Sequence, residues 1–189
     1  MADKNLINNN FKQQGDVCVM ASYATIINYF SDNNLSIDNI LERYINKLSV
    51  SYFQYAKNKQ KKKQESISKH FHKYCWDNGD IRGFEFIKQL HNNNELETNG
   101  FCNIVGFKAQ LQSLSQTDIE LIRRELEEND ALAMVLYKVS DRKFHAVVIG
   151  FDSHYNSYFY KDPEKKQVTN GDILQNKDIW EYIIFNDYE

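Results

Sequence analysis

The sequence predicts an α+β fold with helices in its N-terminal half and an antiparallel sheet in its C-terminal half. Up to about residue 100, apolar residues recur at helical spacing. After Gly100, short apolar runs separated by turn residues take over, which is typical of strands. The length of 189 residues suffices for one well-buried core and is short for two ordinary domains. We therefore expect a single α+β domain over 1–189.

The first predicted helix begins at Cys18 and carries apolar residues at helical spacing as far as Phe30. Gly15-Asp16 supplies a break and an acidic group at the helix start, where the helix dipole favours it. A second helix is expected over about 37–48, which completes a first region of 14–50. Residues 50–100 are more polar and predict a helical insertion, with pieces around 52–74 and 81–90.

The C-terminal region, 101–189, is expected to form the sheet half of the domain. The predicted strands cover 101–107, 131–139, 144–151, 158–161 and 179–185, and an amphipathic helix covers 117–128.

The charge balance excludes several classes of partner. There are 23 basic and 26 acidic residues, for a net charge of −3 and a pI near 6.0, so no cationic field is available for nucleic acid or an anionic membrane. The basic run at 57–63 is better explained as a solvated helix face. No apolar run approaches the roughly 20 residues that span a bilayer. The start, MADKNLINNN, has no apolar signal core. We expect a cytoplasmic protein, or one exported without a cleavable signal peptide; the sequence leaves its oligomeric state open.

Three cysteines are too few and too irregularly spaced for a disulfide scaffold, and no CxxC pair exists for a zinc ribbon. Cys18 lies at a predicted helix start, where unpaired amide groups and the dipole stabilise a thiolate. The alternative is a small buried hydrophobe, which is also our interpretation of Cys102. His70, His72 and Cys75 resemble a metal-binding spacing but lack a fourth ligand, so we expect no metal site.

His145 and Asp162 lie on two predicted strands that flank the turn 152–157. If the strands form a hairpin, opposed residues have numbers that sum to about 307–309, which places the two side chains opposite or one step diagonal on one face. A carboxylate there would orient the imidazole, as in a nucleophile–base–orienter triad. The alternative is a histidine satisfied by a nearby acid.

A cysteine at a helix start, a distant strand histidine and an aspartate on the return strand together form the arrangement that nucleophilic thiol chemistry needs. Gln13 and Gln14, upstream of the cysteine, offer an amide donor to an oxyanion beside the backbone N–H of Cys18.

Two blocks of sequence resemble bacterial papain-like cysteine proteases. The segment 13–30, QQGDVCVMASYATIINYF, is similar to their nucleophile helix, in particular to that of bacteriocin-leader peptidases and papain-like effector proteases. The stretch 145–163 resembles the histidine–hairpin–Asp-Pro block of the same branch, and 122–136 resembles the helix and strand that precede it. The matched blocks cover roughly half of the chain.

The resemblance implies a papain-like fold and a cysteine peptidase or amidase that acts on a polypeptide without a cofactor. Cys18 would be the nucleophile, His145 the general base and acid, and Asp162 the orienting group, with Gln13 or Gln14 at the oxyanion. A glutamine deamidase or acyltransferase would use the same triad. Val19 and the short spacing from Gln13 to Cys18 depart from the family pattern, which keeps open a catalytically degenerate peptide-binding module.

Overall fold

In the described residues, the computed structural model has three helices and six strands, and the strands form one sheet. The described residues are 18–31, 84, 87, 88, 91, 102–110, 112–141, 143–165 and 167–187. In chain order the elements are α2 (Cys18–Ser31), β1 (Cys102–Ala109), α7 (Gln116–Glu128), β2 (Leu132–Ser140), β3 (Lys143–Asp152), β4 (Ser157–Lys161), β5 (Thr169–Asn170), α8 (Ile173–Asn176) and β6 (Ile179–Asp187).

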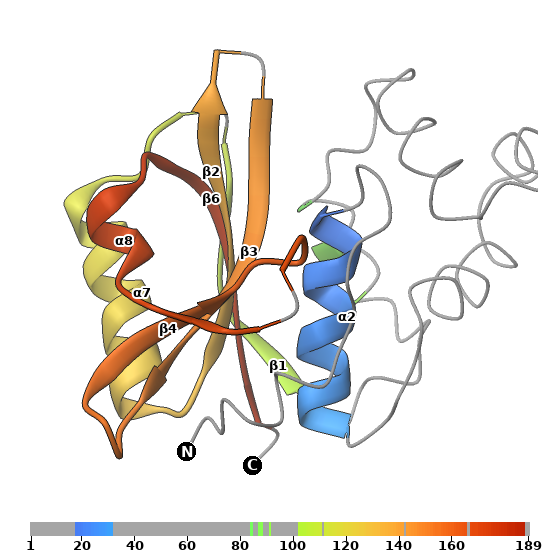
Figure 1. Ribbon diagram of the computed structural model, residues 1–189, viewed down its shortest axis with the longest axis vertical. Coiled ribbons are helices and arrows are strands. Elements are labelled where there is room, and N and C mark those ends of the chain that lie inside the picture. Colours follow the sequence, from blue (N-terminus) through green and yellow to red (C-terminus); the bar gives the residue numbers. More distant parts are fainter. Residues whose placement is uncertain are drawn as a thin grey trace, which may run out of the picture.

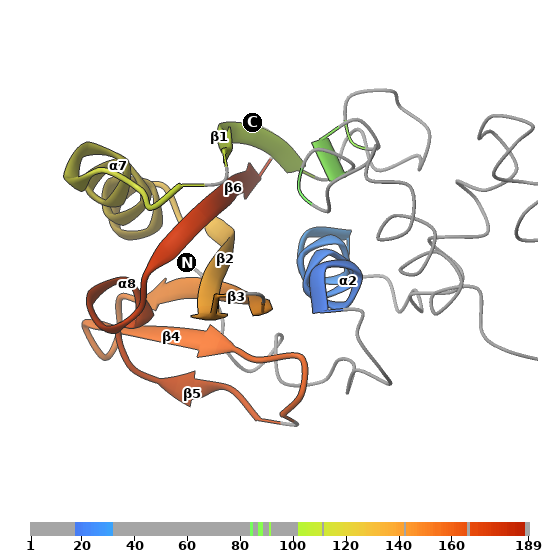
Figure 2. The same ribbon diagram turned by 90° about the horizontal axis from the view of Figure 1, so that it is seen from above.

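The six strands form one antiparallel sheet in the order β1-β6-β2-β3-β4-β5. Helix α2 covers one face of the sheet, and α7 and α8 cover the other (Figures 1 and 2). The prediction of an α+β fold is confirmed. The helix expected from Cys18 and each predicted strand are present, whereas the short elements β5 and α8 were not predicted. The expected helices over 37–48 and 52–74 lie outside the described residues.

Strand β3 is apolar from Ala146 to Phe151 because both faces of the sheet are covered there. Ala146 and Val148 belong to the core under α2, and Val147 and Ile149 belong to the core under α7 and α8. Side chains alternate between faces along a strand, so a strand buried on both sides needs apolar residues at every position. Strand β3 is therefore packed between the two cores.

Helix α2 is fastened to the sheet at its second turn. Ser22 Oγ donates a hydrogen bond of 3.3 Å to the carbonyl of Ala146 on β3. The next residue, Tyr23, is fully buried, and its hydroxyl lies 3.2 Å from Nδ1 of His91. His91 Nε2 donates to the carbonyl of Cys102, 3.0 Å away, so Nδ1 accepts from the tyrosine. His91 thus joins α2 to β1 in its neutral form.

Acidification should weaken this link. Burial lowers the pKa of His91 below 6.5 and outweighs the opposing effect of the Cys102 carbonyl. Stability from the neutral ring is present above pH 6.5 and is lost as the pH falls through the folded-state value. We expect His91→Gln, which keeps a donor and an acceptor but does not titrate, to lose about 1 kcal/mol less unfolding free energy than the wild type between pH 7.5 and 5.5.

Urea unfolding at both pH values measures this difference. The comparison with the Gln variant removes the contribution of the other histidines. Equal losses in the two proteins would contradict the role of His91.

Among the described residues, no helix has the length and apolar character that crossing a membrane requires.

Candidate active site

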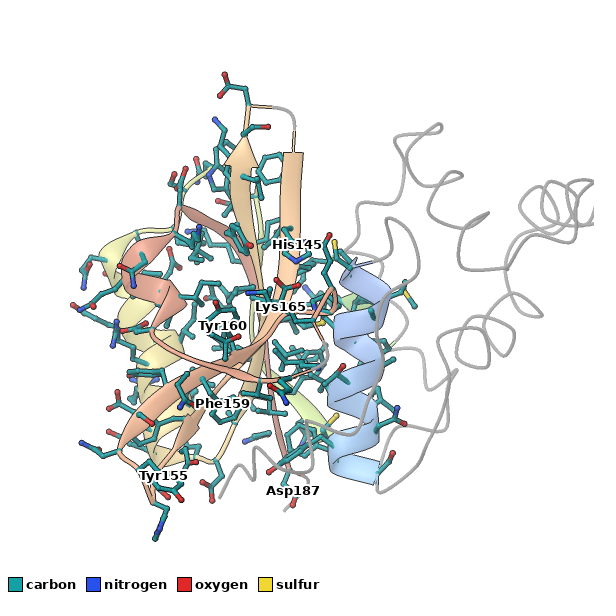
Figure 3. The ribbon with its side chains drawn as sticks, in the orientation of Figure 1. His145, Tyr155, Phe159, Tyr160, Lys165 and Asp187 are labelled. Carbon is teal, nitrogen blue, oxygen red and sulfur yellow. The ribbon has the colours of Figure 1, made fainter. Side chains whose placement is uncertain are left out.

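The beginnings of α2 and β3 lie at the same end of the domain. The two elements run side by side in both views (Figures 1 and 2), and Figure 3 shows His145 at that end, beside the first turn of α2. Cys18 is the first residue of α2, and His145 is the third residue of β3. Packing of the helix on the sheet therefore brings together two residues that are far apart in the sequence.

The imidazole of His145 is bonded on both sides. Its Nε2 lies 2.9 Å from Oδ1 of Asp162, and both residues are buried. The Cys18 side chain is its other polar neighbour and helps to raise the pKa of the ring. Because Nε2 faces Asp162, Nδ1 is the ring nitrogen available to the sulfur. The three side chains form a row of thiol, imidazole and carboxylate. The predicted contact of His145 with Asp162 is confirmed.

The hairpin register decides how Asp162 reaches the histidine. The β3–β4 ladder ends with Val148 paired to Lys161, so paired residue numbers sum to 309. Asp162 is the next residue and falls beside Val147, two positions from His145 on the same face. Of the two placements predicted, the diagonal one occurs, and the imidazole of His145 can span it because aromatic side chains reach diagonal neighbours.

A tight turn holds the carboxylate in place. Oδ1 of Asp162 also accepts a hydrogen bond of 2.9 Å from the backbone N–H of Glu164. The carbonyl of Asp162 accepts another, of 2.9 Å, from the N–H of Lys165. Burial raises the pKa of Asp162, but the hydrogen bonds from His145 and Glu164 outweigh burial and hold that pKa below 3.8. The carboxylate is ionised at neutral pH.

The same contacts favour the imidazolium form of His145. Burial alone would lower the pKa of this histidine, but its hydrogen bonds to Asp162 and Cys18 and the charges of both raise that pKa to about 10. A charged imidazolium beside a sulfur atom is a proton donor for a leaving group.

Tyr137 flanks the histidine and was not predicted from the sequence. It is paired with His145 across β2 and β3, and its ring meets the imidazole edge-on at a centroid distance of 5.7 Å. Burial, with smaller effects of Asp162 and Tyr160, raises the pKa of Tyr137 to about 12, so the phenol stays neutral. Its place beside His145 depends on the β2–β3 register, which shifts between Lys138 and Ser140 and therefore does not follow from simple hairpin arithmetic.

The described cysteines differ in their surroundings. Cys18 is partly exposed and forms no disulfide. Cys102 is buried in the core, and this prediction is confirmed. Burial, with the charge of Asp187, raises the pKa of Cys102 to about 12, which makes its thiol inert at neutral pH. Cys75 lies outside the described residues, as do Gln13 and Gln14, the predicted oxyanion donors.

One group of side chains in the described part of the chain has metal-ligand spacing. The ligand atoms of His145, Asp162 and Glu164 lie within 4.8 Å of one another. Nε2 of His145 carries the proton that it donates to the Asp162 carboxylate, and a protonated nitrogen does not ligate a metal. This geometry is a hydrogen-bonded pair beside an exposed glutamate. His70, His72 and Cys75 lie outside the described residues.

A shallow, open hollow of about 650 Å³ lies on the segment that follows the Asp162 turn. Its described lining residues are Lys165, Gln167, Val168, Thr169 and Asn170. Four of these residues are polar, and Val168 packs against the core under α2.

The site brings together a thiol, an imidazole and a carboxylate, which are the groups that covalent thiol chemistry uses. In comparison with known proteins, the chain matches no protein-family model and no curated protein.

Proposed function

We propose that the protein is a papain-like cysteine peptidase or amidase that hydrolyses a peptide or amide bond of a polypeptide. The observation that carries the proposal is the position of the His145 imidazole, which is hydrogen-bonded to Asp162 and has the side chain of Cys18, the first residue of α2, as its other polar neighbour. The α2 helix packs on an antiparallel sheet, with the histidine on a strand and the aspartate after the next strand. This order of elements supports the papain-like fold that the resemblance of blocks 13–30 and 145–163 implies.

In the first half of the reaction, the Cys18 sulfur attacks the substrate carbonyl carbon and a C–S bond forms. The oxyanion accepts hydrogen bonds from the backbone N–H of Cys18 and, as the sequence predicts, from Gln13 or Gln14. The imidazolium of His145 gives its proton to the leaving nitrogen, and the C–N bond breaks to leave a thioester and a free amine.

In the second half, water attacks the thioester carbonyl while His145 takes the water proton. The C–S bond then breaks, which releases the acid product and restores the thiolate. Asp162 stays deprotonated throughout and stabilises the His145 imidazolium whenever it forms. No cofactor takes part.

Alkylation of Cys18 tests the nucleophile assignment directly. With dilute iodoacetamide, we expect Cys18 to be modified first and Cys102 to stay unmodified in the folded protein, because Cys102 is only 1% exposed. His145→Ala should slow the reaction at Cys18 by roughly tenfold or more, since the imidazole that accepts the proton of the sulfur is lost. Peptide mapping of timed samples gives both rates.

A matched control is His154→Ala, which removes an exposed histidine from the β3–β4 turn. It should leave the rate at Cys18 unchanged. Similar labelling of Cys18 and Cys102, or no effect of His145→Ala, would contradict the assignment.

The fate of the acyl-enzyme separates hydrolysis from the related activities. A glutamine deamidase or acyltransferase shares the thioester and differs only in leaving group and acceptor. Incubation with a tryptic digest of unfolded proteins distinguishes them by mass spectrometry, with Cys18→Ala as the blank. New peptide termini support a peptidase, whereas a mass gain of about one unit at glutamine supports a deamidase.

A peptide-binding module without activity is the remaining alternative. Retention of a peptide on the folded protein, with the same affinity for Cys18→Ala and no product, would favour it.

A further inference from the structure

Lys161 is the most deeply buried charged side chain near the site, and the reaction as written does not use it. It is the last residue of β4 and is 1% exposed. Two positions earlier, Phe159 lies in the core under α2, so alternation directs Lys161 toward the same face of the sheet. Burial lowers the pKa of Lys161, and the charge of Asp162 acts in the opposite direction. An apolar side chain would fill this place without desolvating a charge.

The ammonium group closes the turn that carries the carboxylate. Lys161 Nζ donates a hydrogen bond of 2.8 Å to the carbonyl of Lys165. The N–H of Lys165 donates to the carbonyl of Asp162, and the N–H of Glu164 donates to its Oδ1. The turn 162–165 is thus held by hydrogen bonds of its own backbone to Asp162 and by one hydrogen bond from Lys161. Oδ1 of Asp162, the atom that faces His145, belongs to this bonded set.

We infer that Lys161 is a positioning residue for the proposed thiol chemistry, and this inference rests on the proposed function. The ammonium group holds the 162–165 turn against the end of β4 and thereby keeps Oδ1 of Asp162 at 2.9 Å from Nε2 of His145. Lys161 acts through Asp162 and through no contact with substrate. Loss of the lysine should therefore change the pKa of the His145 imidazole only in a protein that still has Asp162.

An NMR titration of the His145 ring tests the inference without reference to activity. In Lys161→Met, which keeps an unbranched side chain of nearly the same size and loses the donor, we expect the pKa of His145 to fall by about one unit from its wild-type value, a tenfold change in proton affinity. In the Asp162→Asn background, the same substitution should produce no further fall, because the charge that Lys161 positions is already gone.

Alkylation of Cys18 at pH 9 gives the parallel readout. The rate should fall about twofold in Lys161→Met, because a one-unit fall in a pKa of about 10 leaves about half of the imidazole protonated at pH 9. It should be the same in Asp162→Asn with and without the lysine change. Lys161→Gln, which is neutral and shorter, is titrated alongside and should shift the His145 pKa in the same direction. It decides the question if the Met variant does not fold.

The matched control is Lys108→Met on β1, whose ammonium group donates a 2.6 Å hydrogen bond to Asp118. That variant loses a lysine hydrogen bond of the same kind and should leave the His145 pKa unchanged.

An unchanged His145 pKa in the folded Lys161 variants would overturn the positioning role, as would a fall of full size in the Asp162→Asn background. Failure of the proposed function has a different signature. The titration would still show the shift, while wild-type Cys18 would react no faster than His145→Ala.

Discussion

Asp162→Asn should lower the pKa of His145 from about 10 toward the ordinary value of 6.5 and should slow peptide hydrolysis by about 10²-fold to 10⁴-fold at pH 8.5. An asparagine carbonyl still accepts the hydrogen bond from Nε2, so the ring keeps its position and loses only the negative charge beside it. The imidazolium that protonates the leaving nitrogen then disappears at a lower pH. The alkaline limit of activity should move from about pH 10 to near neutrality.

The measurement is a pH profile of Cys18 alkylation and of peptide hydrolysis between pH 5 and pH 11. The matched control is Asp152→Asn at the far end of β3, where a buried carboxylate accepts hydrogen bonds from the amides of His154 and Tyr155. That variant should lose stability and keep the wild-type profile. A wild-type profile in Asp162→Asn would contradict the orienting role of the aspartate.

The same pair makes stability depend on pH. The raised pKa of His145 adds stability that is fully present below pH 6.5 and is lost as the pH rises through about 10. The lowered pKa of Asp162 adds stability that is present above pH 3.8 and is lost as the pH falls below it. The unfolding free energy should therefore decline on the alkaline side, and Asp162→Asn should flatten that decline.

Gly150→Ala should destabilise the fold by about 1–3 kcal/mol, because the added methyl group has no space. A Cβ at Gly150 would clash with Cζ of Phe159 and would lie 2.9 Å from Cδ2 of Leu132. Gly150 and Phe159 are paired across β3 and β4, so the ring lies over the glycine, and both contacting side chains are buried. Because Phe159 is buried, its ring can move away from an added methyl group only by displacing its neighbours.

Urea unfolding measures this loss, and Gly106→Ala is the matched control. The nearest atom to a Cβ at Gly106 is the flexible Cδ1 tip of Ile184, at 2.8 Å, which can shift more cheaply than an aromatic ring. The double variant Gly150→Ala with Phe159→Leu should recover part of the lost stability. Equal stabilities of the two alanine variants would show that the ring does not confine position 150.

Local patterns predicted most of the elements and half of the site. The helix from Cys18 and the strands followed from apolar spacing, because each pattern is read within a few residues. The meeting of His145 with Asp162 followed from hairpin arithmetic for the same reason, since a short turn limits which residues can be opposed. The elements β5 and α8 were missed because two and four residues are too short to carry a period.

Other residues of the site could not be predicted from such patterns. Tyr137 depends on the register of β2 against β3, which includes an irregularity after Lys138. Lys161 looked like the polar end of a strand, and only the return of the chain at Lys165 supplies the carbonyl that its ammonium group needs. Glu164 contributes its backbone N–H, which no side-chain pattern reports.

The sequence by itself determined the α+β class, the helix that begins at Cys18 and the pairing of His145 with Asp162. Only the tertiary structure decided that Cys18 and His145 meet. Ser22 and Ala146, the residues whose hydrogen bond sets α2 against β3, are 124 positions apart, and nothing local relates them. The physical reason is the two-sided burial of β3. Its apolar residues need a covering helix on each face, and the helix that covers one face carries the thiol to the imidazole.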